Sequence, residues 1–600
     1  MIVKKTIPEM LTASVEKYSN NNALCRKESG VWKPVTYGEL GKMAEIASKG
    51  LYSLGLRSKD RIALMIGNSP EWTYTDLGAQ SIGAANVSLY ATLAPEQAAH
   101  ILKDSGSRMV LVAGDEQVDK LKKIIDELPD LETIITLEDG AGPFGSKNVV
   151  TFAEMMAKGT DAGDDVVREV SDAKNKVGED DLASIIYTSG TTGLPKGVML
   201  TNKNFMSNIN GVLEVLSVYD HDSHLSFLPL SHVFERTCGY YLMLASGATI
   251  NYAESMEKIA DNIREIHPTI VISVPRLFEK MIAKIKEKVS YAPAARQKLF
   301  YWALDVGERS TNKNNPDKNS IALKIQYFIA KALVFKKLHQ AFGGRIRFFV
   351  SGGAALSVNV SNFFRSIGIY VVEGYGLTET SPIITANPVD DIRAGTVGKV
   401  LPNVEVKFLE DGELLVRGPS ISKGYFNNEE ATKESFDNDG WFHTGDIAEL
   451  DGDGYLRITD RKKDLIVMSN GKNVAPLTLE SKLVGDEFIA QAVVIGNNRN
   501  YITAVIIADF DRLKRAAGEL GITRVPDSNR ELMEHELTKA FYQERIDQIM
   551  KDFARFEQIK KFVLLSEEFS EDGGELTPTL KIKRKIVSKK YADQIEEMYT

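Results

Sequence analysis

The sequence predicts an α/β protein with a large N-terminal domain of layered α/β subdomains plus a β-rich subdomain, and a small α+β C-terminal domain. In the first half, segments of helical periodicity alternate with short apolar runs, a pattern typical of helices packed on a largely parallel sheet. After Asp390 the pattern changes to short strand-like runs with glycine turns. A smaller unit with one strong strand pair follows Asp460.

The individual elements follow from these patterns in chain order. Helical periodicity predicts helices over residues 37–54 and 71–84, and apolar runs predict strands over residues 61–66, 109–113, 182–186, 269–274 and 346–351. Between the last two strands, residues 291–342 form a lysine-rich, mostly helical insertion that a polar loop interrupts at 310–320. Later strands are expected over residues 404–408, 413–417, 455–458, 492–496 and 502–508.

Length and composition exclude several protein classes. The chain has 600 residues, 43% hydrophobic and 26% charged, which excludes disordered, collagen-like and coiled-coil proteins and suggests several core units. Two cysteines cannot build a disulfide framework. We see no apolar signal segment, and the longest uncharged stretch, 77–95, is too polar for a membrane span. A cytoplasmic protein is therefore expected.

The charge is unevenly distributed. A net charge of −9 argues against nucleic acid as a partner. The segment from Arg276 to His339, however, holds fourteen Lys or Arg and five Asp or Glu, a local excess of nine positive charges. Two interpretations remain open. The segment forms ordinary solvated helix faces, or it contacts an anionic surface, either the inner face of a membrane or the phosphate groups of a small ligand.

The strongest motif is the segment Tyr187–Gly197, which follows a predicted strand. Gly190 and Gly193 allow the backbone to approach an anion closely, and Lys196 adds positive charge. Four hydroxyl side chains can donate hydrogen bonds to phosphate oxygens: Thr188, Ser189, Thr191 and Thr192. The continuation of a Walker A loop is absent. The alternative is a flexible surface loop.

Other chemistries find no support in the sequence. His221, His224 and His232 might suggest zinc, but no cysteine or well-spaced carboxylate completes a ligand set. The sequence has no Gly-x-Ser-x-Gly nucleophile elbow, no His-Glu-x-x-His and no Cys-x-x-Cys.

Together with the motifs that follow it in order, the Tyr187–Gly197 loop resembles the phosphate-binding signature of the adenylate-forming (AMP-binding) superfamily. The resemblance extends from about residue 10 to residue 595. It implies that the turn of Gly352, Gly353 and Ala354 lies against adenine and that Tyr375, between Gly374 and Gly376, stacks on it. Thr378 would contact the α-phosphate, and Glu379 and Thr188 would hold Mg²⁺. Asp446, in the motif 441–446, would bind the ribose hydroxyls together with Arg461.

The resemblance also assigns roles around the C-terminal domain. Residues 1–459 would form the N-terminal AMP-binding domain, 460–464 a hinge centred on Asp460, and 465–600 a mobile lid. Residues 575–584 resemble the catalytic-lysine segment without its usual Ser-Gly pair. Alignment on Tyr591 assigns the lysine to Lys581, with Lys583 as the alternative. His232 would line the acyl site, and the segment 468–476, with Gly471, would enter for the second step.

Within the superfamily, the segments 225–236, 291–342 and 463–476 resemble long-chain acyl-CoA synthetases. This implies ATP-dependent activation of a long-chain fatty acid to acyl-AMP and pyrophosphate, followed by transfer to CoA, with Mg²⁺ as cofactor. One alternative is a fatty acyl-AMP ligase that loads an acyl carrier protein. Another is an inactive nucleotide-binding regulator, against which the presence of Lys196, Glu379, Asp446 and Lys581 argues. A homodimer is left open.

Overall fold

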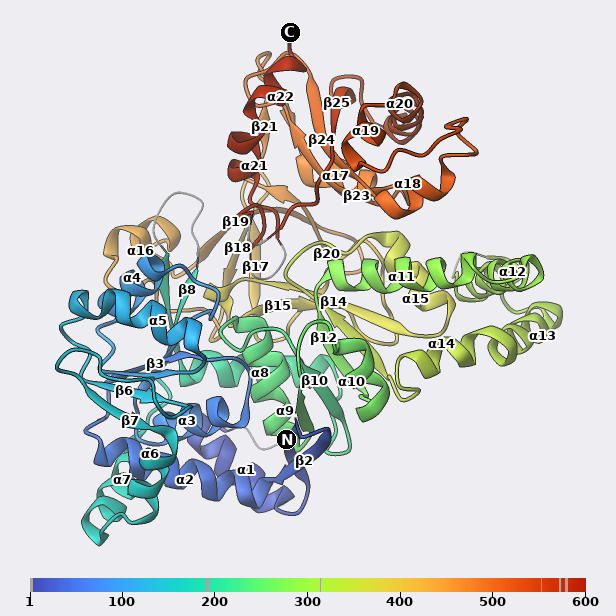
Figure 1. The fold of residues 1–600 in the computed structure, drawn as a ribbon. Helices are drawn as coiled ribbons and strands as arrows, with labels where there is room; N and C mark the ends of the chain where they lie inside the picture. Colours follow the sequence, from blue (N-terminus) through green and yellow to red (C-terminus); the bar gives the residue numbers. More distant parts are fainter. Residues whose placement is uncertain (1–3, 189–194, 313–314, 552, 571–572, 578–580) are drawn as a thin grey trace.

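The computed structural model describes residues 4–600 except 189–194, 313–314, 552, 571–572 and 578–580. Two large sheets form the body of the molecule, and a separate smaller unit, orange to red in Figure 1, lies above their junction. The predicted α/β class, with a large N-terminal part and a distinct C-terminal α+β domain, is confirmed.

The first sheet has seven strands in the order β7-β6-β5-β3-β4-β8-β9. Its strands pair in parallel except β9, which runs antiparallel to β8. The strands are β3 (Arg61–Met65), β4 (Ala85–Ser88), β5 (Met109–Val112), β6 (Thr133–Thr136), β7 (Asn148–Thr151), β8 (Leu182–Thr188) and β9 (Lys196–Thr201). The helices around it are α1 (Ile7–Tyr18), α2 (Tyr37–Ser53), α3 (Pro70–Ser81), α4 (Pro95–Ser105), α5 (Asp115–Ile124), η1 (Ile125–Glu127), α6 (Phe152–Thr160) and α7 (Asp164–Lys176).

Local sequence explains where several of these helices begin. Thr36 caps α2 in a capping box, in which its hydroxyl accepts from the Glu39 backbone and the Glu39 carboxylate accepts from the Thr36 backbone. Ser69 caps α3, and Pro70 occupies the first turn. All twelve residues of α3 are buried, because this helix lies inside the body of the domain.

The second sheet has thirteen strands in the order β17-β18-β19-β20-β16-β15-β14-β13-β12-β10-β11-β1-β2. Its middle is parallel and both ends are antiparallel. Its strands are β1 (Asn22–Glu28), β2 (Val31–Thr36), β10 (Ser223–Ser226), β11 (Thr249–Tyr252), β12 (Ile270–Ser273), β13 (Phe348–Ser351), β14 (Tyr370–Gly376), β15 (Ile383–Ala386), β16 (Gly398–Val400), β17 (Glu405–Phe408), β18 (Glu413–Arg417), β19 (Phe442–Leu450) and β20 (Tyr455–Arg461). The β-rich region after Asp390 is thus hydrogen-bonded into the same sheet as the parallel strands.

One hydrophobic core is shared by the two sheets, and the helices between and around them contribute to it. Among these helices are α8 (Asn202–Val215), the π-helix η2 (Glu235–Tyr241) and α9 (Leu242–Ser246). The other helices of this part are α10 (Ile259–Ile266), α15 (Val358–Ser366), the short η4 (Thr378–Thr380) and α16 (Glu429–Ser435). Cys25 and Cys238 are buried thiols.

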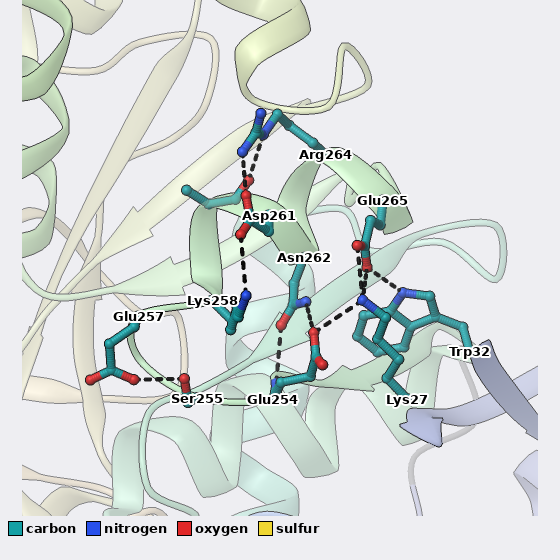
Figure 2. Close-up of polar contacts among 11 residues, drawn as sticks. Lys27, Trp32, Glu254, Ser255, Glu257, Lys258, Asp261, Asn262, Arg264 and Glu265 are labelled. Carbon is teal, nitrogen blue, oxygen red and sulfur yellow. Dashed lines mark hydrogen bonds and ion pairs between the residues drawn. The ribbon is translucent and has the colours of Figure 1, made fainter. Parts of the chain in front are cut away.

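The first hairpin of the chain is tied to this body by a charged cluster at the far edge of the second sheet. Figure 2 shows Lys27 of β1 between the carboxylates of Glu254 and Glu265, at 3.2 and 2.8 Å. The indole nitrogen of Trp32 on β2 donates to Glu265 at 2.8 Å. The charges in this cluster pair with one another and fasten the β1–β2 hairpin to the segment 254–265.

The predicted lysine-rich insertion is helical, as expected, and forms an arm on the right-hand side of Figure 1. Its elements are α11 (Pro275–Ser290), α12 (Ala294–Thr311), α13 (Ile321–Ala330), the π-helical turn η3 (Lys331–Phe335) and α14 (Lys336–Ala341). A second core, which includes Phe278, Phe335 and Phe364, packs these helices against α15 and one face of β12–β14.

The C-terminal unit has its own cores. A three-stranded sheet of β23 (Ile489–Ile495), β24 (Ile502–Ala508) and β25 (Ile559–Leu565) pairs in that order, and β21 (Ile466–Val467) and β22 (Asn473–Val474) form a small ribbon. Its helices are α17 (Pro476–Val484), α18 (Phe510–Ala516), α19 (Asn529–Glu534), α20 (Glu536–Met550), α21 (Arg584–Lys590) and α22 (Ala592–Glu597).

The predicted elements are present, with shifted ends. The strand expected from residue 346 begins at Phe348, and the helix expected to reach residue 84 ends at Ser81. These differences of two and three residues lie at loop junctions, where local patterns are weakest. Among the residues that the structure describes, no helix combines the length and the apolar character needed to cross a bilayer.

Candidate active site

A pair of charged residues faces each other across two strands near the junction with the C-terminal unit. Asp446 of β19 lies in register with Arg461 at the end of β20, and Arg461 Nε donates to Asp446 Oδ1 at 2.9 Å. The other oxygen of Asp446 accepts a hydrogen bond from the hydroxyl of Tyr375 on β14. Tyr375 thus meets Asp446 although β20, β16 and β15 separate their strands in the order of the sheet. Lys462 points to the other side, where it pairs with Asp411 and Glu413.

Lys581 comes from the C-terminal unit and lies at this same place. Its Cε atom is 3.9 Å from the position that a Cβ on Gly353 would occupy, so the lysine stem lies against the turn after β13. Burial and the nearby charge of Arg461 lower the pKa of Lys581 to about 8, although Asp446 opposes this effect. Lys581 has many protein neighbours but is still exposed to water, and this water weakens the influence of the nearby charges on its pKa.

The chain around Lys581 is held at both ends. The backbone N–H of Lys581 donates to Thr577 Oγ1 at 3.0 Å, and the Thr577 N–H donates to the Lys581 carbonyl at 2.8 Å. Arg584 then forms a bidentate pair with Glu480 at 2.6 and 2.8 Å. Lys583, the alternative to Lys581, occupies the N-cap position of α21. The basic run 581–585 is therefore divided between the site and anchoring contacts.

The segment Tyr187–Gly197, predicted to bind phosphate, has described residues on both sides of its centre. Thr188 at the end of β8 and Lys196 at the start of β9 lie in register in the antiparallel pair. Ser189, Gly190, Thr191, Thr192 and Gly193 lie outside the described residues. The hairpin therefore brings the Thr188 hydroxyl and the Lys196 ammonium to the same edge of the first sheet.

Tyr425 joins this loop to Glu379, and sequence reasoning missed it. Its hydroxyl donates to Glu379 Oε1 at 2.7 Å, and Lys196 Nζ lies 5.4 Å from the centre of its ring. Tyr425 is held in place by an isolated bridge to Val198 of β9. A lone tyrosine in a Gly-Tyr-Phe sequence carries no local signal, since its partners are about 230 and 50 residues away.

The segment from Gly374 to Glu379 requires a very tight backbone turn. A Cβ on Gly376 would lie 1.6 Å from the carbonyl oxygen of Pro382, so no larger residue fits without moving the chain. The close contact between Gly376 and Pro382 lets the chain turn directly after β14, so that Thr378 and Glu379 lie in the short helix η4. Glu379 offers a carboxylate and Thr188 a hydroxyl, which are the hard oxygen ligands that Mg²⁺ prefers.

Glu373, the residue before this segment, is a second site residue without a predicted role. It is 5% exposed, on the face of β14 that looks toward α15. Burial raises its pKa to about 8, although the backbone N–H of Leu356 hydrogen-bonds to it. Through Leu356, Glu373 thus fixes the end of the turn 352–356.

His232 and its neighbours lie on the opposite side of that turn. A Cβ on Gly352 would be 2.8 Å from the ring of Phe234, so the loop 228–234 is in close contact with the turn 352–356. Burial, with the charge of Lys581, lowers the pKa of His232 to about 3. His232 is therefore neutral at physiological pH. Ala354 and Gly353 are exposed at the open side of the turn.

Two buried charges anchor this loop to both sheets. The guanidinium of Arg236 donates to Asp76 Oδ1 of α3 at 2.7 Å and to the hydroxyls of Ser88 and Ser184, each at 2.9 Å. Glu235 turns the other way and accepts from Ser226 at 2.6 Å on β10. His224 Nε2 lies 2.9 Å from Glu235, so this histidine pairs with a carboxylate. Within the described parts of the chain, no group of three metal-ligating side chains is present.

The proposed hinge residue Asp460 is buried at the base of the C-terminal unit. Its carboxylate accepts from the backbone N–H of Arg461 at 2.6 Å and from that of Leu477 at 3.4 Å. Burial raises the pKa of Asp460 to about 6. Gly471 has a φ of +77° in the ribbon turn, a conformation that favours glycine.

Contacts across the two units hold Lys581 in this position. Arg276, the second residue of α11, donates to the Ala490 carbonyl at 2.9 Å and lies 3.4 Å from Glu568. Asn359 of α15 donates to the Gly485 carbonyl at 3.0 Å. One residue of the basic segment, Arg276, thus contacts the C-terminal unit of the same chain.

Comparison with known proteins finds relatives along nearly the whole chain. The AMP-binding enzyme family matches residues 11–426, and the AMP-binding enzyme C-terminal domain matches residues 463–600. The chain is 34% identical over 576 residues to a long-chain-fatty-acid–CoA ligase of Mycobacterium bovis, covering 95% of this chain and 93% of that protein. A human long-chain-fatty-acid–CoA ligase is 30% identical over 626 residues, covering 99% and 85%.

Solved structures show the same fold. The anthranilate–CoA ligase in complex with anthranoyl-AMP superposes with a TM-score of 0.75 at 21% identity, covering all of this chain and 99% of that one. A fatty acyl-CoA synthetase of Mycobacterium tuberculosis has a TM-score of 0.62 at 23% identity, covering 98% and 99%. With both domain matches covering nearly the whole sequence, this chain belongs to the AMP-binding enzyme family.

Proposed function

We propose that this protein is an AMP-forming long-chain fatty acid–CoA ligase. The observation that carries the proposal is the meeting of Lys581 with Asp446, Arg461 and Gly353. The link of Tyr425 to both Glu379 and Lys196 supports it. The long-chain-fatty-acid–CoA ligases that the chain resembles support this assignment.

In the first step, a carboxylate oxygen of the fatty acid attacks the α-phosphorus of ATP. A new P–O bond forms, the bond to the β-phosphate breaks, and pyrophosphate leaves with the bonding electrons. Both reactants are anions, so catalysis depends on positioning and on positive charge. Lys196 and protonated Lys581 would supply that charge, and Asp446 and Arg461 would fix the ribose. Glu379 and Thr188 would hold Mg²⁺, which neutralises phosphate charge when bound.

In the second step, the thiol of CoA loses its proton and its sulfur attacks the acyl carbon. The C–O bond to AMP breaks, and AMP leaves. The thiol needs access to a site where Lys581 now lies. We therefore propose that residues 465–600 move relative to 1–459 about Asp460, within 460–464, and that the turn at Gly471 approaches the site in that step. Neutral His232 would line the acyl side without adding charge.

An assay of AMP release with palmitate and CoA tests the proposal. Pyrophosphate from ATP and palmitate alone, followed by CoA-dependent AMP and palmitoyl-CoA, is the expected result, and acids from acetate to oleate would define the chain-length range. Transfer to an acyl carrier protein but never to CoA would replace the proposal with an acyl-AMP ligase. Absence of pyrophosphate with every acid would indicate a nucleotide-binding regulator.

The basic segment adds a proposal about location. Long-chain acids partition into membranes, and the positive excess between Arg276 and His339 favours peripheral contact with an anionic membrane surface. We propose such contact for the arm formed by α11–α14.

A further inference from the structure

The arm carries large apolar side chains on its solvent side. On α13, Ile321 is 77% exposed, Phe328 73% and Ile325 56%. Ile329 and Leu333 continue the surface at 41% and 49%. Isolated exposed apolar residues are ordinary, but five on one continuous helical stretch form a patch that needs a reason.

Four of these five residues lie on one side of α13. At about 100° per residue, positions 321, 325, 328 and 329 fall within one arc of this helix, and exposed Leu333 follows in the π-helical turn η3. The opposite side is also apolar, and there Leu323, Ala330 and Val334 are buried against the core of the arm. The fold therefore buries one apolar face of the helix and leaves the other apolar face exposed to solvent.

Lysines border the exposed face. Lys324 and Lys331 lie along one side of the arc, and Lys336 and Lys337 follow η3 at the start of α14. All four are exposed. An apolar stripe bordered by lysines is the pattern of a helix that lies in the interface of an anionic membrane, because lysine stems can extend along apolar surface toward phosphate groups.

The position of the face connects it with the site. Figure 1 shows α12 and α13 at the outer end of the arm, away from the C-terminal unit. The arm begins at α11, directly after Val274, whose Cγ1 is 3.8 Å from the Cβ position of Gly353 beside Lys581. The chain thus runs from the edge of the candidate site through α11 and α12 to the exposed face of α13.

We propose that the solvent face of α13, continuing through η3 into α14, docks into the surface of an anionic phospholipid membrane. The five apolar residues enter the interface, and the four lysines contact lipid phosphates. A second copy of the chain fits less well, because a symmetric contact through this face would bring the same lysines together. The segment's positive excess, within a chain of net charge −9, also directs this face rather than the whole molecule toward an anionic surface.

The biological role of this face, delivery of a membrane-dissolved acid, rests on the proposed function. Binding of the face to a membrane does not rest on it and can be measured without ATP, CoA or acid. Co-sedimentation of the full chain with vesicles of phosphatidylcholine plus phosphatidylglycerol, compared with phosphatidylcholine alone, is the direct test. Binding to the anionic vesicles that weakens with salt is the expected result.

Two variants and a matched control define the surface. The double variant Ile325→Gln, Phe328→Gln should lower the partition coefficient about tenfold or more, since it removes two inserted side chains. Lys324→Glu with Lys331→Glu should abolish the preference for anionic lipid. Met256→Gln, which alters a 51% exposed side chain outside the arm, should bind like the unchanged protein. Unchanged ligase activity on a short, water-soluble acid would show that each variant is folded.

Equal vesicle binding by all variants would overturn the proposal. So would concentration-dependent dimerisation, measured by light scattering, that the Ile325 and Phe328 changes abolish while vesicle binding persists, because the occupant would then be a second copy. A chain that binds vesicles as expected but makes no acyl-CoA would overturn the proposed function and leave the docking surface intact.

Discussion

At the scale of single residues, the structure distinguishes two lysines that lie two positions apart. Lys581 lies beside Asp446 and Arg461, whereas Lys583 begins α21. Lys581→Ala should slow formation of acyl-AMP about a hundredfold or more, because one positive charge at the reacting phosphate is lost. Thioesterification of supplied acyl-AMP should be nearly unchanged, since we propose that the lysine has left the site in that step.

Pyrophosphate release measures the first half-reaction, and CoA consumption with supplied acyl-AMP measures the second. Lys583→Ala is the matched control and should retain most of both activities. A comparable loss in both half-reactions for Lys581→Ala, or a larger loss for Lys583→Ala, would contradict the assignment of Lys581.

Glu373 predicts a pH dependence of stability. Burial raises the pKa of this carboxyl from 4.5 to about 8 in the folded protein. A group whose pKa is raised by folding stabilises the fold fully below its unfolded pKa, and that stability is lost as the pH rises through the folded pKa. The loss therefore occurs between about pH 4.5 and pH 8.

Glu373→Gln keeps the shape and removes the ionisation. Its free energy of unfolding should exceed that of the unchanged protein by a few kcal/mol (order of magnitude) at about pH 9, and the difference should shrink toward pH 5. Urea melts across this pH range provide the measurement. A difference that stays constant with pH would show that Glu373 does not titrate in this range.

At the scale of elements, the π-helix η2 depends on a buried ion pair. Arg236 and Asp76 are both fully buried, and Asp76 also accepts from the hydroxyls of Tyr240 at 3.1 Å and Tyr241 at 2.8 Å. Asp76→Ala should lower the free energy of unfolding by about 3–5 kcal/mol, because it leaves the Arg236 charge buried without its carboxylate.

Denaturant unfolding tests this expectation. Asp261→Ala, which removes a carboxylate from an exposed pair with Arg264 in α10, is the control and should change stability by less than about 1 kcal/mol. Equal effects of the two substitutions would mean that the buried network contributes no more than an exposed pair.

The helix α11 predicts a second effect at this scale. Arg276 bridges from its first turn to Ala490 and Glu568 of the C-terminal unit. Arg276→Ala should reduce the rate of acyl-AMP formation several-fold, because the arrangement that brings Lys581 to the site loses a charged contact. Thioesterification should be unaffected or slightly faster, because this contact would not hold the units in the rearranged state.

Arg309 offers a control from the same basic segment, because it pairs with Asp305 inside α12. Arg309→Ala should leave both half-reactions at the level of the unchanged protein. If Arg276→Ala slows both steps equally, the contact stabilises the fold and does not select one arrangement of the units.

At the scale of the whole molecule, two sheets that share one core bring together residues from distant segments. Thr188 and Lys196 come from the edge of the first sheet, Asp446 and Arg461 from the antiparallel end of the second, and Lys581 from the separate C-terminal unit. The proposed site therefore lies where two sheets with a common core meet the separately packed C-terminal unit, so that this unit can move while the residues on the sheets stay in place.

The sequence alone determined the α/β class, the order of the elements and the motifs around Thr188, Glu379, Asp446 and Lys581, because periodicity and motif spacing are local properties of the chain. It could not reveal Tyr425 or the contact of Phe234 with Gly352, because both depend on packing between distant segments. It also could not divide the basic segment into Arg276, which contacts the C-terminal unit, and the exposed face of α13. Residues on opposite sides of a helix look alike in sequence when both are apolar, and only the packed core decides which side is buried.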